Sequence, residues 1–195
     1  MMRRLILGSQ SPRRRELLGG LGVAFDTVTI DADESYPADL QAEQIPLYIA
    51  RAKARAYAPR LGAEDLLITA DTLVWCEGQV LGKPHDEQDA RRMLRLLSGR
   101  THQVFTAVVL TAGDGAGEQS FVDTTDVTFR VLTDSEIEYY IRTCRPFDKA
   151  GAYGIQEWIG YVGVTGIRGS YFNVMGLPLE PLYRALQERM TEEGE

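Results

Sequence analysis

The sequence predicts an α/β fold built on a mixed, twisted β-sheet that is flanked by helices. Stretches with helical periodicity alternate along the chain with short β-favouring stretches, which is typical of helices packed on a sheet. Two long β-favouring stretches, 102–112 and 119–132, are separated only by the glycine-rich turn GDGAG and therefore predict an antiparallel hairpin. A sheet that contains such a hairpin together with helix-connected strands is mixed.

The first predicted elements are a strand, a helix and a second strand. Residues 5–7 are apolar and run into a turn, after which Ser11 is a typical N-cap and Pro12 suits the first helical position. We expect this helix to end at the glycine-rich segment 19–22. The stretch VAFDTVTI at 23–30 predicts the second strand and leads into the acidic turn DADESYP.

The next predicted elements are a helix over 45–58 and a strand over 66–75. The helix has Pro46 at its start, and its apolar residues recur at helical spacing, so that Lys53 lies on or beside the apolar stripe. The strand LLITADTLVW is β-favouring throughout, with Asp71 in its middle.

The remaining elements follow from turns and caps. The turn CEGQ predicts that 80–84 returns along the preceding strand, and Asp86 caps an amphipathic helix over 86–98. A capping box at 133–136 starts the next helix, and residues 179–190 form a surface helix before a polar tail.

Composition narrows the class of protein. A length of 195 residues is close to that of one domain, so we expect a single domain over 1–195. The net charge of −7 argues against binding a nucleic-acid polymer. No apolar segment is long enough to cross a membrane, and the N-terminal LIL is too short for a secretory signal, so a cytoplasmic protein is expected.

Three consecutive arginines, 13–15, fill the first turn of the first helix. Each cation there opposes the helix macrodipole, by roughly 0.3–1 kcal/mol where it is exposed. An anion docked at that end would meet free backbone N–H groups and guanidinium groups together. The run is therefore either a solvated surface feature or part of a site for a compact polyphosphate.

Asp71 is the first candidate for chemistry. A carboxylate in so apolar a strand must be paired, bind a metal or open into a cleft, or else it is a structural Asp bonded to nearby backbone. The acidic turn with Asp31, Asp33 and Glu34 offers oxygen ligands for Mg²⁺, although such turns are more often merely solvated.

The other chemistry-bearing residues give weaker signals. The GKP at 82–84 is not a Walker A motif, because Pro84 stands where Ser or Thr is needed. Lys83 either reaches a phosphate as a point charge or is an exposed turn lysine. Two cysteines without metal-binding spacing are expected to be structural in a reducing compartment, and no spacing supports a Cys/His nucleophile.

Several motifs taken together resemble the Maf family of nucleoside triphosphate pyrophosphatases, in the order in which that family has them. They are SQSPRRRELL, the acidic pair at 33–34, RAKA around Lys53, TADTLV around Asp71, LGKP, LSGRTHQVFTAV, DKAGAYGIQ and GSYFNVMGLPL. The resemblance extends from Leu5 to about Leu182. It implies a Maf-like, ITPase-related α/β fold with two lobes around a deep cleft, and hydrolysis of a nucleoside triphosphate to the monophosphate and pyrophosphate.

The resemblance also implies roles for individual residues. Asp71 resembles the family's proton acceptor, and Glu34 and Asp71 its site for a divalent metal cation, Mg²⁺ or Mn²⁺. The implied substrate-binding residues are Ser9, Arg13, Arg14, Lys53, Thr72, Lys83 and Gln156. Arg15 is expected to face elsewhere, because successive helical residues are about 100° apart.

Three positions indicate the branch of the family that hydrolyses dTTP and UTP, namely Arg13, Thr72 and Gln156. The branch that acts on 7-methyl-GTP differs there. The amide of Gln156 offers both a donor and an acceptor to a uracil or thymine edge.

The chain departs from the family pattern at two places. Gly8 replaces the usual Ala, and Glu157, followed by Trp158, replaces the usual Gly after Gln156. The added carboxylate either shifts preference toward CTP or modified pyrimidines, or points outward.

Two functions remain open from the sequence. The first is the pyrimidine-nucleotide pyrophosphatase, and the second is a nucleotide-binding regulator of cell division or septum formation that needs no turnover. Asp71, Glu34 and Lys53 together favour chemistry, because a pure binder needs cations but no positioned base. A homodimer is expected from the resemblance and from general frequency.

Overall fold

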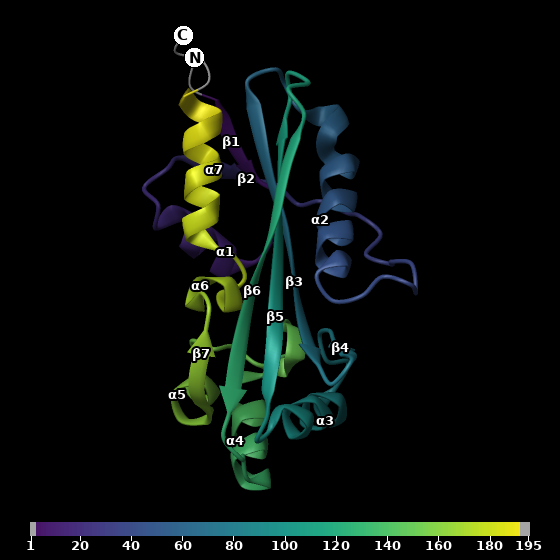
Figure 1. The fold of residues 1–195 in the computed structure, drawn as a ribbon, viewed down its shortest axis with the longest axis vertical. Helices are drawn as coiled ribbons and strands as arrows, with labels where there is room; N and C mark the ends of the chain where they lie inside the picture. Colours follow the sequence, from purple (N-terminus) through teal and green to yellow (C-terminus); the bar gives the residue numbers. More distant parts are fainter. Residues whose placement is uncertain (1–2, 192–195) are drawn as a thin grey trace. The chain divides into compact units, whose positions relative to one another are not determined.

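The structure, a computed structural model, describes residues 3–191 and contains a seven-stranded sheet with the order β2-β1-β3-β5-β6-β7 and β4 paired to β3 (Figure 1). The strands are β1 (Arg4–Leu7), β2 (Phe25–Thr27), β3 (Asp65–Cys76), β4 (Gln79–Leu81), β5 (Thr101–Ala112), β6 (Glu118–Phe129) and β7 (Val164–Arg168). β1 is parallel to β2 and β3, whereas β4 is antiparallel to β3 and β7 to β6. The predicted mixed α/β sheet is therefore confirmed.

Seven helices and two short 3₁₀ turns accompany the sheet within the described chain. They are α1 (Pro12–Gly19), α2 (Gln44–Tyr57), α3 (Glu87–Leu97), α4 (Asp134–Cys144), α5 (Trp158–Gly163), α6 (Tyr171–Met175) and α7 (Leu179–Thr191), with 3₁₀ turns at Ala58–Arg60 and Ala150–Ala152. The predicted caps are confirmed: the Ser11 side chain caps α1, Asp86 caps α3 and a Thr133–Glu136 capping box begins α4.

The chain divides into two compact units. Unit 1 runs from the start of the described residues to Asp71 and adds Thr106–Asp123 and the segment from Gly176 onward. Unit 2 consists of Thr72–Phe105 and Thr124–Met175. Strands β3, β5 and β6 contribute residues to both units. The expected deep cleft stays a prediction.

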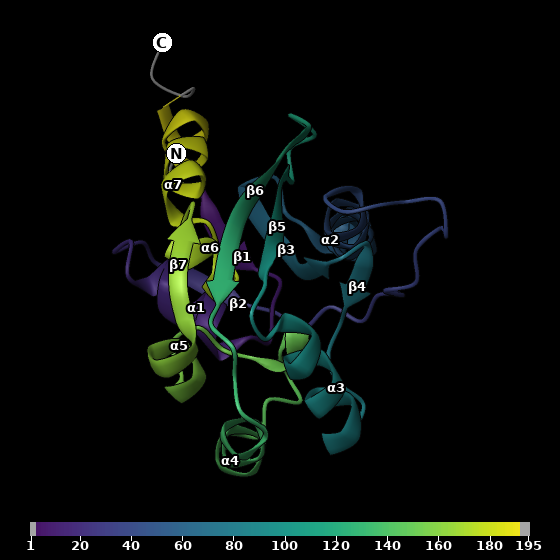
Figure 2. The same ribbon diagram turned by 60° about the horizontal axis from the view of Figure 1, so that its bottom comes forward.

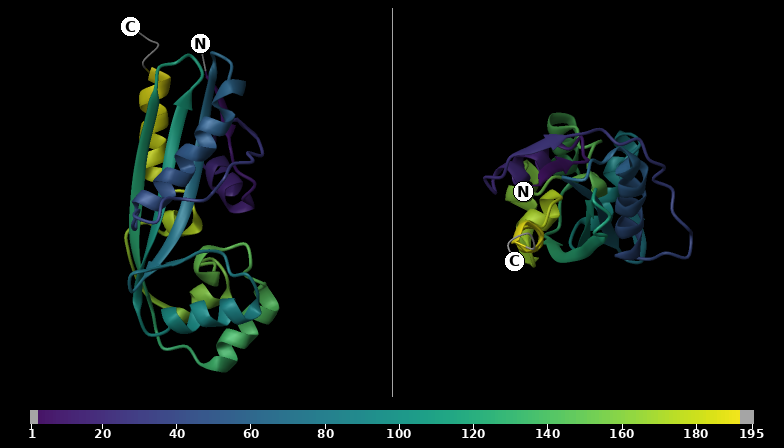
Figure 3. Two further views of the ribbon diagram at one scale, coloured as in Figure 1. Left: turned by 90° about the vertical axis from the view of Figure 1, so that its right-hand side faces the viewer. Right: turned by 90° about the horizontal axis from the view of Figure 1, so that it is seen from above.

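In unit 1, α2 lies against the sheet (Figure 3). Ala50 and Ala54 pack on Ala107 and Val109 of β5, and small side chains on both elements permit this close approach. The Thr69 hydroxyl of β3 donates to the Ala50 carbonyl at 2.8 Å. These contacts hold the helix that carries Lys53 beside the strand that carries Asp71.

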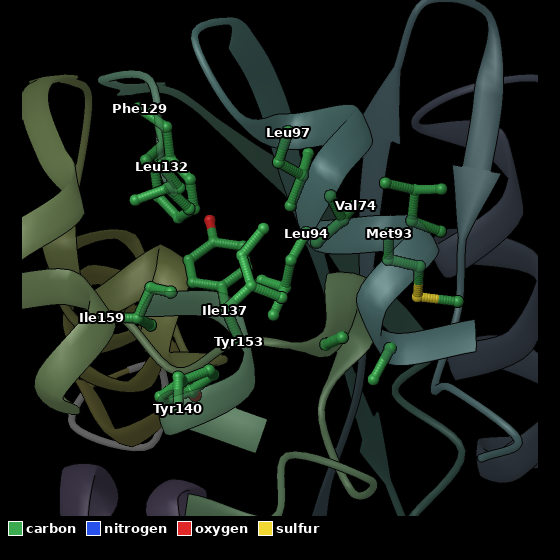
Figure 4. Packing of buried hydrophobic residues seen from close by; sticks show 14 of the residues in the cluster. Val74, Met93, Leu94, Leu97, Phe129, Leu132, Ile137, Tyr140, Tyr153 and Ile159 are labelled. Atoms are coloured by element: carbon green, nitrogen blue, oxygen red, sulfur yellow. The ribbon is translucent and has the colours of Figure 1, made fainter. Parts of the chain in front are cut away.

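Unit 2 has its own hydrophobic core, formed largely by helices (Figure 4). Leu94 and Leu97 of α3, Ile137 and Tyr140 of α4 and Ile159 of α5 are buried together. Figure 2 shows α3 and α4 next to each other, and α4 also contacts α5. The Tyr140 ring thus lies inside a packed cluster, which fixes the direction of its hydroxyl.

Two predicted strands need correction, and one segment contains elements that were not predicted. The second strand covers only Phe25–Thr27, not 23–30, because its parallel partner β1 ends at Leu7 and the last pairing is from Val28 N–H to the Leu7 carbonyl. The second hairpin strand ends at Phe129 rather than at 132. In the segment 145–178, α5, β7 and α6 are elements that the sequence analysis did not predict.

Candidate functional site

The turn before α1 is held by its own side chains. The Ser11 N–H donates to the Ser9 hydroxyl at 3.2 Å, and the Arg14 N–H donates to the Ser11 hydroxyl at 3.4 Å. Ser9 therefore organises the turn, and Ser11 satisfies one of the N–H groups that a helix start leaves unpaired.

Gly8, the first departure from the family pattern, has a steric explanation. A Cβ atom at this position would lie 2.4 Å from Cδ1 of Ile30 and 3.1 Å from Cγ2 of Thr69. The Ile30 side chain occupies the space that a methyl group would need. Ile30 and Gly8 thus form a matched pair in this chain.

The three arginines of α1 have different surroundings. Arg15 is exposed, whereas Arg13 and Arg14 are half-buried. Arg14 Nε donates to the Gly176 carbonyl at 2.7 Å, and its Nη1 donates to the Ala70 carbonyl at 2.8 Å. Arg14 therefore ties α1 to the residue that directly precedes Asp71.

The charge environment of Arg14 links several predicted site residues. Burial lowers the pKa of its guanidinium, and the nearby Asp71 opposes this shift. The charges of Arg13 and Glu34 also act on Arg14, in opposite directions. The start of α1, the acidic turn and β3 therefore meet in one polar region of unit 1.

Lys53 joins the two predicted carboxylates. Its Nζ lies 2.8 Å from Oδ1 of Asp71 and 2.9 Å from Oε1 of Glu34. The side chains of Lys53 and Asp71 are 13% and 16% exposed, whereas Glu34 is 53% exposed. Of the alternatives for Asp71, the structure shows a paired carboxylate, and it brings Glu34, Lys53 and Asp71 together as one cluster.

The donor set fits a metal that is bound in part by its substrate. Within residues 3–191, no group of three or more His, Cys, Asp or Glu residues forms a metal cage. Mg²⁺ usually takes one or two protein carboxylates and completes its octahedron with water and substrate phosphates. Glu34 and Asp71, which both contact the Lys53 ammonium group, supply that number of carboxylates.

The other predicted binding residues belong to unit 2. Thr72 follows Asp71 in β3 and is half-buried, and Lys83 is exposed after β4. The Gly151 N–H donates to the Gly82 carbonyl at 3.1 Å, which fixes the backbone next to Lys83. Thr72 and Lys83 are thus assigned to unit 2, whereas the Lys53 cluster is assigned to unit 1.

Gln156 has a buried hydrogen-bond acceptor that is unpaired among the described residues. Its side-chain Oε1 is buried and has no hydrogen-bond partner among the described residues. Its backbone carbonyl accepts from the Tyr161 hydroxyl at 2.6 Å. Leaving a buried polar atom unpaired costs about 1–3 kcal/mol, so a ligand donor at this position would be stabilising.

Glu157, for which the sequence left two alternatives, contacts two residues that the sequence analysis did not single out, Lys149 and Tyr140. Glu157 does not point outward: its Oε1 lies 3.0 Å from Lys149 Nζ, and its Oε2 accepts from the Tyr140 hydroxyl. Lys149, in the DKAGAYGIQ motif, is 8% exposed. A lysine followed by small residues in an apolar segment was a usable signal, whereas nothing local points to Tyr140.

The Cys/His alternative gains no support. Burial raises the pKa of the Cys76 thiol, which opposes formation of a thiolate nucleophile. The Nε2 atom of His102 is hydrogen-bonded to the Tyr153 hydroxyl at 2.7 Å, and both residues are buried in the core of unit 2. His102 is therefore part of the packing and not the partner of a nucleophile.

Comparison with known proteins gives a consistent result. A family model described as Maf-like protein matches residues 4–189. A dTTP/UTP pyrophosphatase of Phocaeicola vulgatus and one of Bacteroides fragilis are each 56% identical over 186 residues, which cover 95% of this chain and 95% of the relative. A dTTP/UTP pyrophosphatase of Porphyromonas gingivalis is 51% identical and covers 95% of this chain and 94% of the relative.

Among solved structures, the Staphylococcus aureus Ham1 protein has a TM-score of 0.49 and 12% identity, over 65% of this chain and 72% of that chain. A likeness of this size carries no conclusion about fold or activity.

Proposed function

This chain belongs to the Maf-like protein family, and we propose that it hydrolyses dTTP and UTP to the nucleoside monophosphate and pyrophosphate. The observation that carries the proposal is the cluster of Asp71, Lys53 and Glu34 in the polar region at the start of α1. The names of relatives that are 50–56% identical support the same reaction.

Asp71 is the proposed general base. Attack of water on the α-phosphorus requires a group that accepts the proton of the water. The contact with Lys53 keeps the Asp71 carboxylate in one orientation, and packing of α2 on β3 keeps Lys53 in place. Glu34 and Asp71 would hold Mg²⁺ or Mn²⁺, which supplies charge neutralisation for the triphosphate oxygens.

The cationic residues are proposed to bind the triphosphate. Arg13 lies at the N-terminus of α1, where backbone N–H groups and the helix dipole favour an anion. Arg14 and Ser9 hold this turn in shape, and Lys53 and Lys83 supply further positive charge. Binding that strengthens as pyrophosphate leaves stabilises the transition state.

Gln156 is the proposed reader of the base, with Arg13 and Thr72 as the other positions that distinguish this branch. A uracil or thymine edge presents an N–H between two carbonyl groups. A side-chain amide offers an acceptor and a donor to that edge, and the Gln156 acceptor is unpaired and buried. Cytosine reverses this pattern at two of the three positions, with an amino donor at C4 and an acceptor at N3, so CTP and modified pyrimidines are the informative competitors.

We also propose that the protein acts in the cytoplasm as a homodimer without a nucleic-acid polymer. In the part of the chain that the structure describes, no helix has the length and apolarity to cross a bilayer. Sedimentation of the purified protein at several concentrations tests the dimer.

The decisive experiment is a substrate panel. Conversion of dTTP, UTP, CTP, ATP, GTP and 7-methyl-GTP to the monophosphate is measured by chromatography, with Mg²⁺, with Mn²⁺ and with chelator. Metal-dependent hydrolysis of dTTP and UTP with a monophosphate product is the expected result. Nucleotide binding without hydrolysis of any substrate would refute the enzyme and favour the division regulator.

A further inference from the structure

We propose that Glu157 is a positioning residue that, together with Lys149 and Tyr140, fixes the direction of Gln156 and thereby sets preference for uracil and thymine bases. This inference rests on the proposed function, because it concerns how the same site reads the base. It also explains why a carboxylate follows Gln156 in this chain.

Both carboxylate oxygens of Glu157 have partners from different segments. Oε1 lies 3.0 Å from Lys149 Nζ, and Oε2 accepts from the Tyr140 hydroxyl of α4. Lys149 also contacts Asp148 Oδ1 at 2.7 Å. The side chains of Lys149 and Glu157 are 9% and 24% exposed, so these contacts are shielded from solvent and constrain both partners strongly.

The Tyr140 hydroxyl has a second task. It accepts the Gly154 N–H at 2.9 Å while it donates to Glu157. Tyr140 therefore ties the two ends of segment 154–157, and its own ring is fixed in the core of unit 2 (Figure 4). Burial and the Glu157 carboxylate both raise the pKa of Tyr140, so the phenol keeps the proton that it donates.

Gly154 is shaped for the same carboxylate. A Cβ atom there would lie 2.9 Å from Cδ and 3.0 Å from Oε2 of Glu157. The Glu157 side chain therefore folds back under Gly154, and the Glu157 N–H donates to the Gly154 carbonyl at 3.0 Å. The backbone between these two residues forms a closed turn around the carboxylate.

Gln156 lies inside this turn and is restrained by it. The Gln156 carbonyl accepts from the Tyr161 hydroxyl, and the next residue, Glu157, is anchored by the contact of its side chain with Tyr140. These contacts fix the backbone from which the Gln156 side chain extends, and its Oε1 is buried without a partner among the described residues. The Gln156 acceptor can take the ring N3–H of uracil and thymine, whereas N3 of cytosine carries no proton and its donor is the 4-amino group at a different position on the edge.

The test compares Glu157→Ala with Glu157→Asp, Tyr140→Phe and the control Glu138→Gln. Glu138 lies on α4, the helix of Tyr140, and forms an ion pair with Arg91 of α3. It makes no hydrogen bond or ion pair with segment 154–157 in the described part of the chain. For Glu157→Ala we expect KM for UTP and dTTP to rise about tenfold with kcat nearly unchanged, which corresponds to one lost hydrogen-bonding interaction. The ratio of kcat/KM for UTP to that for CTP falls by a similar factor.

Aspartate keeps the charge on a shorter side chain, so Glu157→Asp restores part of the ratio, and Tyr140→Phe lowers it. Glu138→Gln leaves KM and the ratio unchanged. The inference would be overturned if Glu157→Ala lowered the melting temperature but left KM and the UTP/CTP ratio of kcat/KM unchanged, because its role would then be purely structural. Tyr140→Phe serves for the same comparison if Glu157→Ala does not fold.

A second readout does not need activity. In NMR spectra, the side-chain amide resonances of Gln156 are identified by their loss in Gln156→Ala. We expect them to shift in Glu157→Ala and to stay in place in Glu138→Gln. Failure of the wild-type protein to hydrolyse dTTP or UTP would refute the proposed function. In that case an unshifted Gln156 signal would refute the positioning role as well, and a shifted signal would retain it.

Discussion

Replacement of Asp71 by Asn separates catalysis from binding. Asn has the same shape as Asp and keeps an oxygen that can accept from Lys53 Nζ, which lies 2.8 Å away. It cannot accept a proton from water at neutral pH. The variant therefore removes the proposed base while it leaves most of the surrounding structure in place.

The expected magnitudes follow from the contacts of Lys53. After the substitution, Lys53 keeps its ion pair with Glu34 at 2.9 Å and can still donate to the Asn oxygen, so the free energy of unfolding should fall by only about 1–3 kcal/mol. Loss of general-base catalysis lowers kcat by about 10²–10⁴, which raises the activation free energy by roughly 3–5 kcal/mol. Because Asp71 is also a proposed metal ligand, nucleotide binding is compared without metal, where Arg13 and Lys83 are unaltered and affinity should stay within about threefold.

The assay combines turnover, calorimetric nucleotide binding and urea unfolding. Glu118→Gln is the matched control, because Glu118 forms an ion pair with Arg51 of α2, the helix that also carries Lys53. This control should retain wild-type kcat. An Asp71→Asn protein that turns over dTTP at a rate near that of the wild type would refute the assignment of Asp71 as the base.

Three further predictions concern binding and stability. Arg13→Ala should raise KM for dTTP by about tenfold or more and lower kcat, as steady-state kinetics will show, and an unaltered KM would contradict the anion site at α1. Burial lowers the pKa of His102 to about 4, so the unfolded chain takes up a proton at a higher pH than the folded protein and stability falls as pH decreases. The free energy of unfolding measured in urea should be about 2 kcal/mol lower at pH 5 than at pH 7. An equal decrease in His102→Asn would exclude this cause. Thr133→Ala removes the cap of α4 and should cost about 1 kcal/mol in the same assay, with an unchanged midpoint as the contrary result.

Local signals predicted most helix starts correctly. Ser11, Asp86 and Thr133 each accept a hydrogen bond from a backbone N–H in the first turn, and this interaction needs only three or four neighbouring residues. Strand length was harder, since β2 ends where its partner β1 turns away, which residues 23–30 do not encode. Segment 145–178 has short elements held by tertiary contacts, so its periodicity is too brief to detect.

The site shows the same distinction between local and distant causes. The apolar surroundings of Asp71 left a paired carboxylate as one of several alternatives, and helical spacing predicted that Lys53 lies on or beside an apolar stripe. Only the packing of α2 on the sheet shows that the two meet. Glu34 joins them from a turn with no regular structure. A resemblance to a family placed all three in one site before any geometry was known.

Glu157 illustrates why identity at a position does not define its role. A carboxylate next to the proposed base-reading residue would weaken base recognition if it faced the base, because it would compete with Gln156 for the same donors. Here Lys149 and Tyr140 engage both of its oxygens, and the absence of a side chain on Gly154 makes room for it. Both oxygens of the carboxylate are therefore occupied by contacts within unit 2, which is the basis of our proposal that Glu157 holds the backbone that carries Gln156 rather than contacting the base itself.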